Sequence, residues 1–166
     1  SKITLNSQTA GSQWILTTSA DDADVKYAVV KDSKSTNASI RTKYSTNSGN
    51  NTNWTFAAAY RWTGSTSTAW KTASNWQVET EPDTWSSTAN YPGENDSEDS
   101  AYISTAAGTR WPVYSDTSAL SLKLISIDTD AKLSVNTTNN IILSDSSSPL
   151  TNKGTVIFQN TGRFID

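Results

Sequence analysis

Short runs in which apolar and polar residues alternate recur along the chain. In the first third these runs include Ile3 and Leu5, Trp14 and Leu16, and Val25, Tyr27 and Val29. Turn-forming residues rich in Gly, Asn, Asp and Ser separate them, at 8–12, 20–24 and 47–53. A period of two is that of a half-buried β-strand, and no stretch keeps the 3.6-residue period of a helix. We therefore expect an all-β protein without long helices.

The C-terminal third has the same pattern. Its apolar positions are Leu120, Leu122 and Leu124, then Ile125 and Ile127 in a shifted register, then Leu133 and Val135, Ile141 to Leu143, Val156 and Phe158, and Phe164. Gly154 precedes a strand-like run, as residues at the corners of a solenoid often do. Rungs of about twenty residues would stack around one continuous core. A β-sandwich with short strands and frequent turns fits the same periodicity, so both architectures stay open here.

The middle of the chain differs from both flanks. It holds Trp62, Trp70, Trp76, Trp85 and Trp111, together with three of the four prolines. We expect a loop-rich module held by aromatic packing rather than by regular strands. The predicted organisation is N-terminal solenoid rungs at 1–59, a Trp-rich module at 60–118, and C-terminal rungs at 119–166.

The residues from Tyr60 to Trp76 carry a pattern of the form W-T-G…W…A-x-N-W. This pattern resembles a motif of large, repetitive bacterial surface proteins. The segments 91–96, 99–103 and 111–113 resemble the parts that follow it, although the gap from Trp76 to Pro92 is longer here, so Trp85 lies in an insertion. The segment 25–33 is similar to parallel β-helix rungs of such proteins. The resemblance implies a right-handed parallel β-helix, secretion and surface display, and it implies no catalytic residue.

Composition excludes several chemistries. Only 34% of the residues are hydrophobic, yet seven Trp and six Tyr indicate a folded, β-rich chain rather than a disordered one. Cys, Met and His are absent, so there is no thiolate nucleophile, no imidazole ligand and no Ser-His-Asp triad. The net charge is −3 and Lys and Arg do not cluster, which argues against nucleic-acid binding. No apolar run approaches the length of about 20 residues that spans a bilayer, so we expect no membrane insertion.

Aromatic residues among polar neighbours are candidates for sugar binding. A planar ring can stack on a pyranose while its N–H or O–H bonds to hydroxyl groups. Trp85, Tyr91 and Tyr114 are the predicted stacking residues. For Trp62, Trp70, Trp76 and Trp111 we expect a structural core instead.

Two acidic patches could in principle hold calcium. Asp96, Glu98 and Asp99 supply hard oxygen ligands at close spacing, and Asp21, Asp22 and Asp24 form a similar group. Neither has the ligand alternation and fixed glycine of an EF-hand loop, and a solvated turn is the favoured interpretation of both. No other cofactor is expected.

Carboxylate positions bear on the possibility of an enzyme. A glycosidase needs two carboxyl groups about 5–10 Å apart across the scissile bond. Here the acids concentrate in turns, and the exceptions, Asp32 and Asp128, are not paired by spacing. The sequence therefore predicts a non-catalytic structural or adhesive segment of a secreted or cell-surface protein. The alternative is a carbohydrate-binding module, and a fragment of a polysaccharide-active enzyme is less favoured.

Several partners follow from these expectations. They are glycans, host or cell-surface proteins, and further copies of the chain. Both termini lie in strand-like sequence, at Ile3 and at Phe164, and open strand edges favour further pairing. End-to-end self-association is therefore one expected behaviour, and flanking domains in a longer parent are the other.

Overall fold

The protein is described by a computed structural model that covers residues 1–18, 23–104 and 109–165. Within these ranges the regular elements are strands, apart from one 3₁₀ turn, η1 (Ala73–Asn75). No α-helix occurs in the described residues, and most strand pairs are parallel, so the all-β prediction is confirmed. The chain forms two compact units, Ser1–Ala57 (the N-terminal unit) and Ala58–Asp166 (the C-terminal unit).

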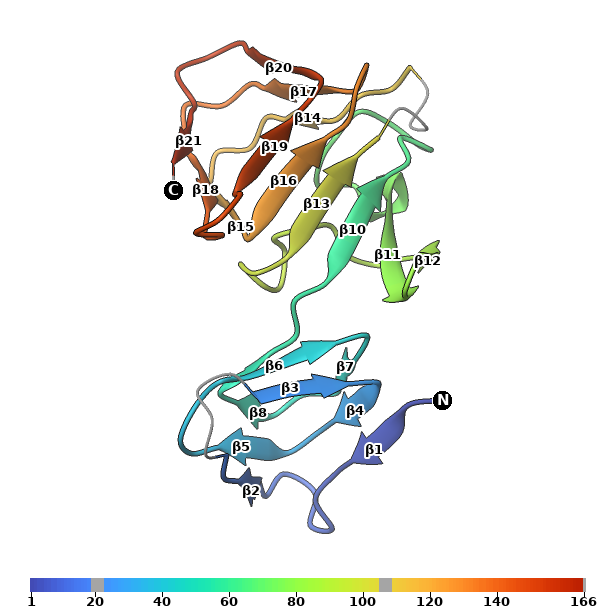
Figure 1. Ribbon diagram of the computed structural model, residues 1–166, viewed down its shortest axis with the longest axis vertical. Coiled ribbons are helices and arrows are strands. Elements are labelled where there is room, and N and C mark those ends of the chain that lie inside the picture. The colour runs from blue at the N-terminus through green and yellow to red at the C-terminus, as the bar shows by residue number, and fades with distance from the viewer. Residues whose placement is uncertain (19–22, 105–108, 166) are drawn as a thin grey trace. The chain divides into compact units, whose positions relative to one another are not determined.

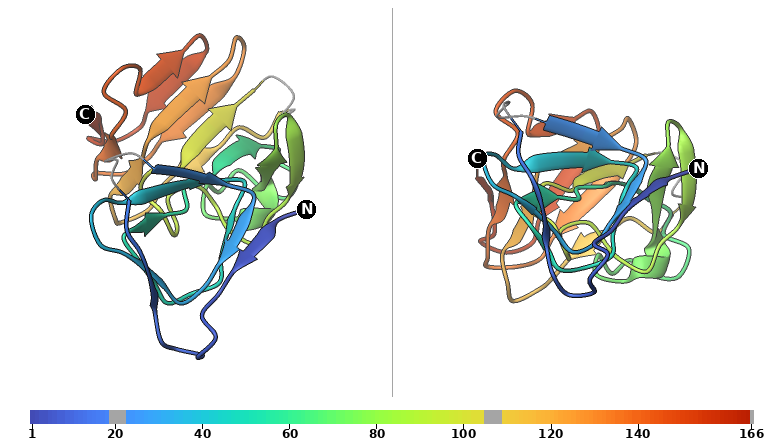
Figure 2. Two further views of the ribbon diagram at one scale, coloured as in Figure 1. Left: turned by 60° about the horizontal axis from the view of Figure 1, so that its bottom comes forward. Right: turned by 90° about the horizontal axis from the view of Figure 1, so that it is seen from below.

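The described residues of the N-terminal unit form nine short strands. They are β1 (Ile3–Leu5), β2 (Trp14–Leu16), β3 (Ala23–Lys26), β4 (Ala28–Val30), β5 (Ser33–Ser35), β6 (Ile40–Lys43), β7 (Thr46–Asn47), β8 (Asn51–Thr52) and β9 (Trp54–Thr55). Each strand pairs in parallel with the third strand after it, which gives three sheets, β1-β4-β7, β2-β5-β8 and β3-β6-β9. The chain turns from one sheet to the next along a roughly triangular path (Figure 2). Parallel pairing of this kind argues against the antiparallel β-sandwich.

Two polar residues with left-handed backbone conformation link the N-terminal rungs at one corner. Asp32 and Asn50 precede paired strands and have φ of 52° and 53°. Asp and Asn accept this left-handed conformation more readily than most residues. The Asp32 carboxylate accepts hydrogen bonds from the Gly11 N–H (3.2 Å) and from Asn50 Nδ2 (2.7 Å). Three successive turns are thereby joined.

A second corner of the N-terminal unit is aromatic. Tyr27 and Tyr44 follow the paired residues Lys26 and Lys43, and both have positive φ. Their rings stack with centroids 5.3 Å apart. Matching residues one rung apart thus stack on each other, as expected of a repeating architecture.

The C-terminal unit is drawn in Figure 1, and its described residues form twelve strands in three sheets. They are β10 (Ala59–Trp62), β11 (Trp76–Glu81), β12 (Thr84–Ser87), β13 (Ser100–Ile103), β14 (Val113–Tyr114), β15 (Leu120–Leu122), β16 (Leu124–Ile127), β17 (Lys132–Val135), β18 (Ile141–Leu143), β19 (Leu150–Asn152), β20 (Thr155–Phe158) and β21 (Phe164–Ile165). The sheets are β12-β11-β10-β13-β16-β19, β14-β17-β20 and β15-β18-β21. All pairs are parallel except β10 with β11 and β11 with β12.

Alternation places the apolar side chains of the C-terminal unit inside. The buried apolar positions of β15 to β18 are Leu120, Leu122, Ile125, Ile127, Leu133, Val135, Ile141 and Leu143. The register shift expected between Leu124 and Ile125 coincides with the turn at Lys123, where the chain passes from β15 to β16. In the last rung, Phe158 lies opposite buried Val135 but is 46% exposed. Phe158 is therefore partly open to solvent, whereas Leu150, Val156 and Phe164 of the same rung are partly buried against the core.

The middle segment is more regular than the sequence suggests. Strand β10 pairs in parallel with β13, and Ala69 forms a bridge with Val113, so the segment takes the place of a rung. An antiparallel hairpin, β11–β12, extends the large sheet, and its turn contains Pro82 and Asp83 (φ 59°). The expectation of a module without regular strands is thus wrong for this hairpin. The module and the C-terminal rungs also share one hydrophobic core.

Candidate functional site

The tryptophans of the W-T-G…W…A-x-N-W pattern form an aromatic layer in the core of the C-terminal unit. Trp62, Trp70 and Trp76 are at most 2% exposed. The ring of Trp76 meets those of Trp62 and Trp70 edge to face, with centroids 4.9 and 4.7 Å apart. The structural role predicted for these three residues is confirmed, and Trp111 packs half-buried against the same core.

Each indole N–H of this aromatic layer has a backbone acceptor. Trp62 Nε1 donates to the Arg110 carbonyl (2.7 Å), Trp70 Nε1 to the Pro92 carbonyl (3.2 Å), and Trp76 Nε1 to the Trp70 carbonyl (2.7 Å). Buried indole groups are normally satisfied in this way. Trp62, Trp70 and Trp76 are therefore not available to a ligand.

The glycine of the W-T-G pattern is fixed by sterics. Gly64 has φ of +59°, and a Cβ atom there would lie 2.5 Å from the Arg110 carbonyl oxygen. The same oxygen accepts the hydrogen bond from Trp62. A side chain at position 64 would therefore displace the acceptor that holds the Trp62 ring.

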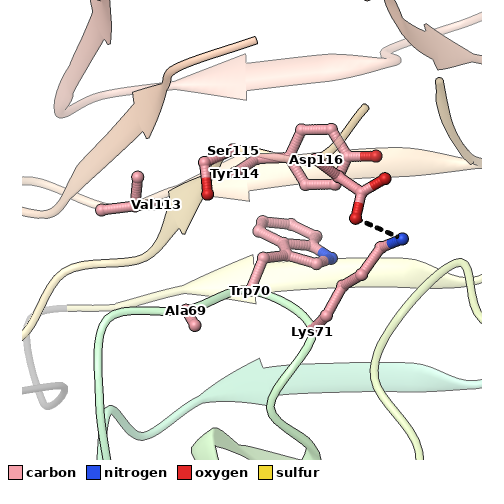
Figure 3. Close-up of a pocket in the computed structure, with 7 residues that line it drawn as sticks. All are labelled: Ala69, Trp70, Lys71, Val113, Tyr114, Ser115 and Asp116. Carbon is pink, nitrogen blue, oxygen red and sulfur yellow. Dashed lines mark ion pairs between the residues drawn. The ribbon is translucent and has the colours of Figure 1, made fainter. Parts of the chain in front are cut away.

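A shallow recess beside the aromatic layer is the hollow shown in Figure 3. Its volume is about 90 Å³, and it is lined by Ala69, Trp70, Lys71, Val113, Tyr114, Ser115 and Asp116. Lys71 Nζ and the Asp116 carboxylate form a salt bridge of 2.7 Å at its rim. Small-molecule pockets are usually about 300–1,000 Å³, so this recess is too small to be one.

Two of the predicted stacking residues lie next to this recess, and neither is an open platform. Tyr114 is 1% exposed, packs edge to face against Trp70, and donates from its hydroxyl to the Ser118 carbonyl (2.9 Å). Its prediction as a stacking residue is wrong, because the ring faces the core and leaves no surface for a sugar. Tyr91 is half-buried against the core, and Lys71 Nζ lies 5.9 Å from its ring centroid.

The remaining predicted stacking residue, Trp85, belongs to a group on the outer face of the large sheet. Tyr60 and Trp62 point inward from β10, so Arg61 between them points outward. In the strand register Arg61 lies opposite Gln77 on β11 and opposite Tyr102 on β13. Trp85 on β12 lies opposite Glu79, which is on the same face of β11 as Gln77.

Arg61, Gln77, Trp85 and Tyr102 form what we call the outer-face cluster. Arg61 Cζ lies 5.0 Å from the centroid of the Trp85 ring. The Nε of the same guanidinium donates to Gln77 Oε1 (2.8 Å). The rings of Trp85 and Tyr102 meet edge to face at 6.4 Å. Tyr102 is 38% exposed and Trp85 is half-buried. The structure thus brings one sequence-predicted residue together with three that sequence reasoning missed.

The carboxylates of the acidic patch make hydrogen bonds within the protein. Asp99 is buried, and its two oxygens accept the N–H groups of Ala58 (2.8 Å) and Gly93 (3.0 Å). The Asp96 carboxylate accepts the Glu98 N–H, while the Glu98 carboxylate accepts the Ser144 hydroxyl. Across the described residues, no group of three or more acidic, His or Cys side chains is placed to hold a metal ion. The calcium prediction for Asp96, Glu98 and Asp99 is therefore not supported, and in the second patch Asp21 and Asp22 lie outside the described residues.

Burial of Asp99 has an expected consequence for stability. Burial raises the pKa of this carboxyl group to about 6, against the pull of its two backbone hydrogen bonds. The folded state then binds a proton more tightly than the unfolded state, whose Asp pKa is about 3.9. Stability contributed by this group is present below about pH 4 and is lost as the pH rises through 6, by about 2–3 kcal/mol.

Urea unfolding of the wild type at pH 4.5 and pH 7.5 would measure most of this loss, about 2 kcal/mol. The pKa of Asp116 is lowered, first by its hydrogen bond with Lys71, and that group loses its stabilising effect only below about pH 4. The two contributions are therefore separated by pH. An Asp99→Asn variant should lose the decline between pH 4.5 and 7.5, and a wild type that becomes more stable over this interval would contradict the assignment.

Comparison with known proteins gives no relative: no family model matches the chain, and no curated protein or solved structure matches it either. Within the described residues, no helix has the length and apolar character needed to cross a membrane.

Proposed function

We propose that this chain is a non-catalytic structural segment of a secreted bacterial surface protein, built as two stacks of right-handed parallel β-helix. The proposal is supported above all by the repeated parallel pairing of each strand with the third strand after it. In such a stack each rung contacts only its neighbours, so length can be added without redesigning a core. That property suits a spacer or adhesive stalk.

The inward face of the last rung is in keeping with this role. The ring centroids of Phe158 and Phe164 lie 5.6 Å apart. In the strand register these residues lie opposite the buried residues Val135 and Ile141. They occupy positions that are fully buried one rung earlier. A further rung could pair there in the same register, either from the same polypeptide or from another copy, which is how the proposed end-to-end association would occur.

The roles of the carboxylates favour a non-catalytic segment. Asp32 is engaged by Gly11 and Asn50, Asp99 by two backbone N–H groups, and Asp116 by Lys71 and Ser118. Each holds a turn or a loop in place. A general acid or base needs instead to face a substrate.

Surface labelling tests the proposed location. An antibody raised against this chain should stain intact cells of the source organism, and brief protease treatment of those cells should remove the signal. A cytoplasmic protein of the same cells serves as the control and should stain only after permeabilisation. Staining of this chain that also requires permeabilisation would contradict the proposal.

The second candidate function, carbohydrate binding, is favoured by one observation. Two aromatic rings and a guanidinium group lie together on an outer sheet face, where they can meet a ligand without any change in the core. A scaffold and a glycan-binding site are compatible in one chain.

A further inference from the structure

We propose that the outer-face cluster of Arg61, Gln77, Trp85 and Tyr102 binds glycans that carry a carboxylate, such as chains of uronic acids or sialylated ends. The inference goes beyond the structural role, and a failure of surface labelling would leave it standing.

The aromatic part of the cluster is held in place before any ligand arrives. Trp85 sits on the outermost strand of the large sheet, with Tyr102 at its edge and Arg61 over its ring. Little side-chain freedom remains to be lost on binding, which reduces the entropic cost. A half-buried ring of this kind presents an apolar surface to the C–H groups of a pyranose.

The charge of Arg61 selects the class of sugar. Its Nε is used by Gln77, whereas its Nη groups make no hydrogen bond to any described residue. Within the described part of the chain, no Asp or Glu forms a salt bridge with Arg61 either. A planar guanidinium with free N–H groups binds a carboxylate in a two-pronged geometry. The cation therefore favours an acidic sugar over a neutral one.

Glu79 sets the direction in which such a sugar would lie. It is on the outer face opposite Trp85, and its Oε1 accepts the Asp83 N–H (3.1 Å). An acidic group placed beside Glu79 would be repelled. The ligand carboxylate is thus expected on the Arg61 and Tyr102 side, away from the β11–β12 turn.

The surface that continues from Tyr102 fits an extended saccharide. In register, Tyr102 is followed by Ser126 on β16 and Thr151 on β19. Strands lie about 4.8 Å apart, so the row from Gln77 to Thr151 extends about 19 Å across the sheet. Hydroxyl side chains along this row can bond to sugar hydroxyls. A stable protein–protein interface buries about 800 Å² on each partner. Beyond Tyr102 this row consists of small polar side chains, so it offers too little apolar area for such an interface.

Matched acidic and neutral ligands provide the test. Oligogalacturonides should bind the intact chain in isothermal titration calorimetry, and their methyl esters, which keep the ring and remove the charge, should bind at least about tenfold more weakly. The binding of the acid should weaken in high salt. The acidic panel also includes oligoguluronate, hyaluronan fragments and sialyllactose, because the cluster defines a class and not one sugar.

Variants link the binding to the cluster. Trp85→Ala and Arg61→Gln should each weaken binding by about tenfold or more, whereas Trp85→Phe should keep most of it because a ring remains. Lys132→Gln is the matched control, since it removes one positive charge from an exposed position on β17 in another sheet. Circular dichroism and urea unfolding establish that each variant is folded.

Three results would overturn the proposal. One is the absence of binding to every member of the acidic panel. Another is equal binding of the acids and their methyl esters, which would remove the role of Arg61. The last is an equal loss in Lys132→Gln and Arg61→Gln, which would show a general charge effect in place of a site.

Discussion

Replacing Trp70 with alanine is expected to lower the free energy of unfolding of the C-terminal unit by about 3–5 kcal/mol. The Trp70 side chain is 1% exposed. It packs edge to face against Trp76 and Tyr114, with ring centroids 4.7 and 6.1 Å apart. Its removal leaves a cavity between rings that cannot collapse easily, because Trp62 and Tyr114 hold neighbouring positions in the same layer. The Pro92 carbonyl also loses its hydrogen bond from Nε1.

Urea unfolding followed by far-ultraviolet circular dichroism measures this effect without relying on the tryptophan signal. Trp70→Phe keeps most of the ring volume and loses the N–H, so a smaller loss of about 1–3 kcal/mol is expected. Trp85→Ala is the control from the outer face, where a half-buried ring is removed without opening a core cavity. If Trp70→Ala cost no more than Trp85→Ala, the aromatic layer could not be the main support of this unit.

Apolar alternation was sufficient to predict most strands, but it could not decide how they pair. Leu133 and Val135 show by their spacing that one face of a strand is buried. Nothing in that spacing states that their partners are Val156 and Phe158 in a parallel register. In the N-terminal unit, equivalent corners of successive rungs are marked by turn residues: Asp32 and Asn50 both have positive φ and are joined by a hydrogen bond.

The sequence carries a signal for the β11–β12 hairpin that the expectation of a loop-rich module leaves out. Trp76 and Val78 alternate, and Pro82-Asp83 is a turn pair in which Pro fixes φ and Asp accepts a positive φ. The density of tryptophan and proline in this region favours irregular structure instead. In physical terms, the aromatic rings pack inside a rung, and the prolines lie in the loops and turns around it.

The candidate site shows the same limit at the level of single side chains. Trp85 could be selected from its polar neighbours, but Arg61 and Tyr102 come from other strands and meet it only through the register. Tyr114 has similarly polar neighbours in Ser115 and Asp116, yet its ring faces inward. On a strand of two residues, neighbours in sequence do not show which side is buried.

Asn75 is the asparagine of the N-W pair that ends the motif, and its side-chain amide makes four hydrogen bonds. It is fully buried, its Oδ1 accepts the N–H groups of Thr66 (3.0 Å) and Ser67 (2.8 Å), and its Nδ2 donates to Ser67 Oγ and to the Ala69 carbonyl, both at 2.9 Å. One amide thus fixes the loop that follows Gly64. The loop in turn carries Trp70 into the core, so the polar and aromatic parts of the motif act together.

The second large effect is therefore expected from Asn75→Ala, which should lower the free energy of unfolding by about 3–4 kcal/mol. Four hydrogen bonds are lost in this variant, and their partners become partly unsatisfied. Asn75→Asp separates the two halves of the amide: it keeps the acceptor for Thr66 and Ser67 but places a negative oxygen against the Ala69 carbonyl. The pKa of the new carboxyl group should rise, and its protonated form can donate a hydrogen bond to the Ala69 carbonyl. Asn75→Asp should therefore become more stable relative to the wild type as the pH falls from 7 to 4. Urea unfolding at both pH values measures this, with exposed Asn136→Ala as the control, for which a change within about 0.5 kcal/mol is expected. An Asn75→Ala variant as stable as Asn136→Ala would show that the loop is held by the tryptophans alone.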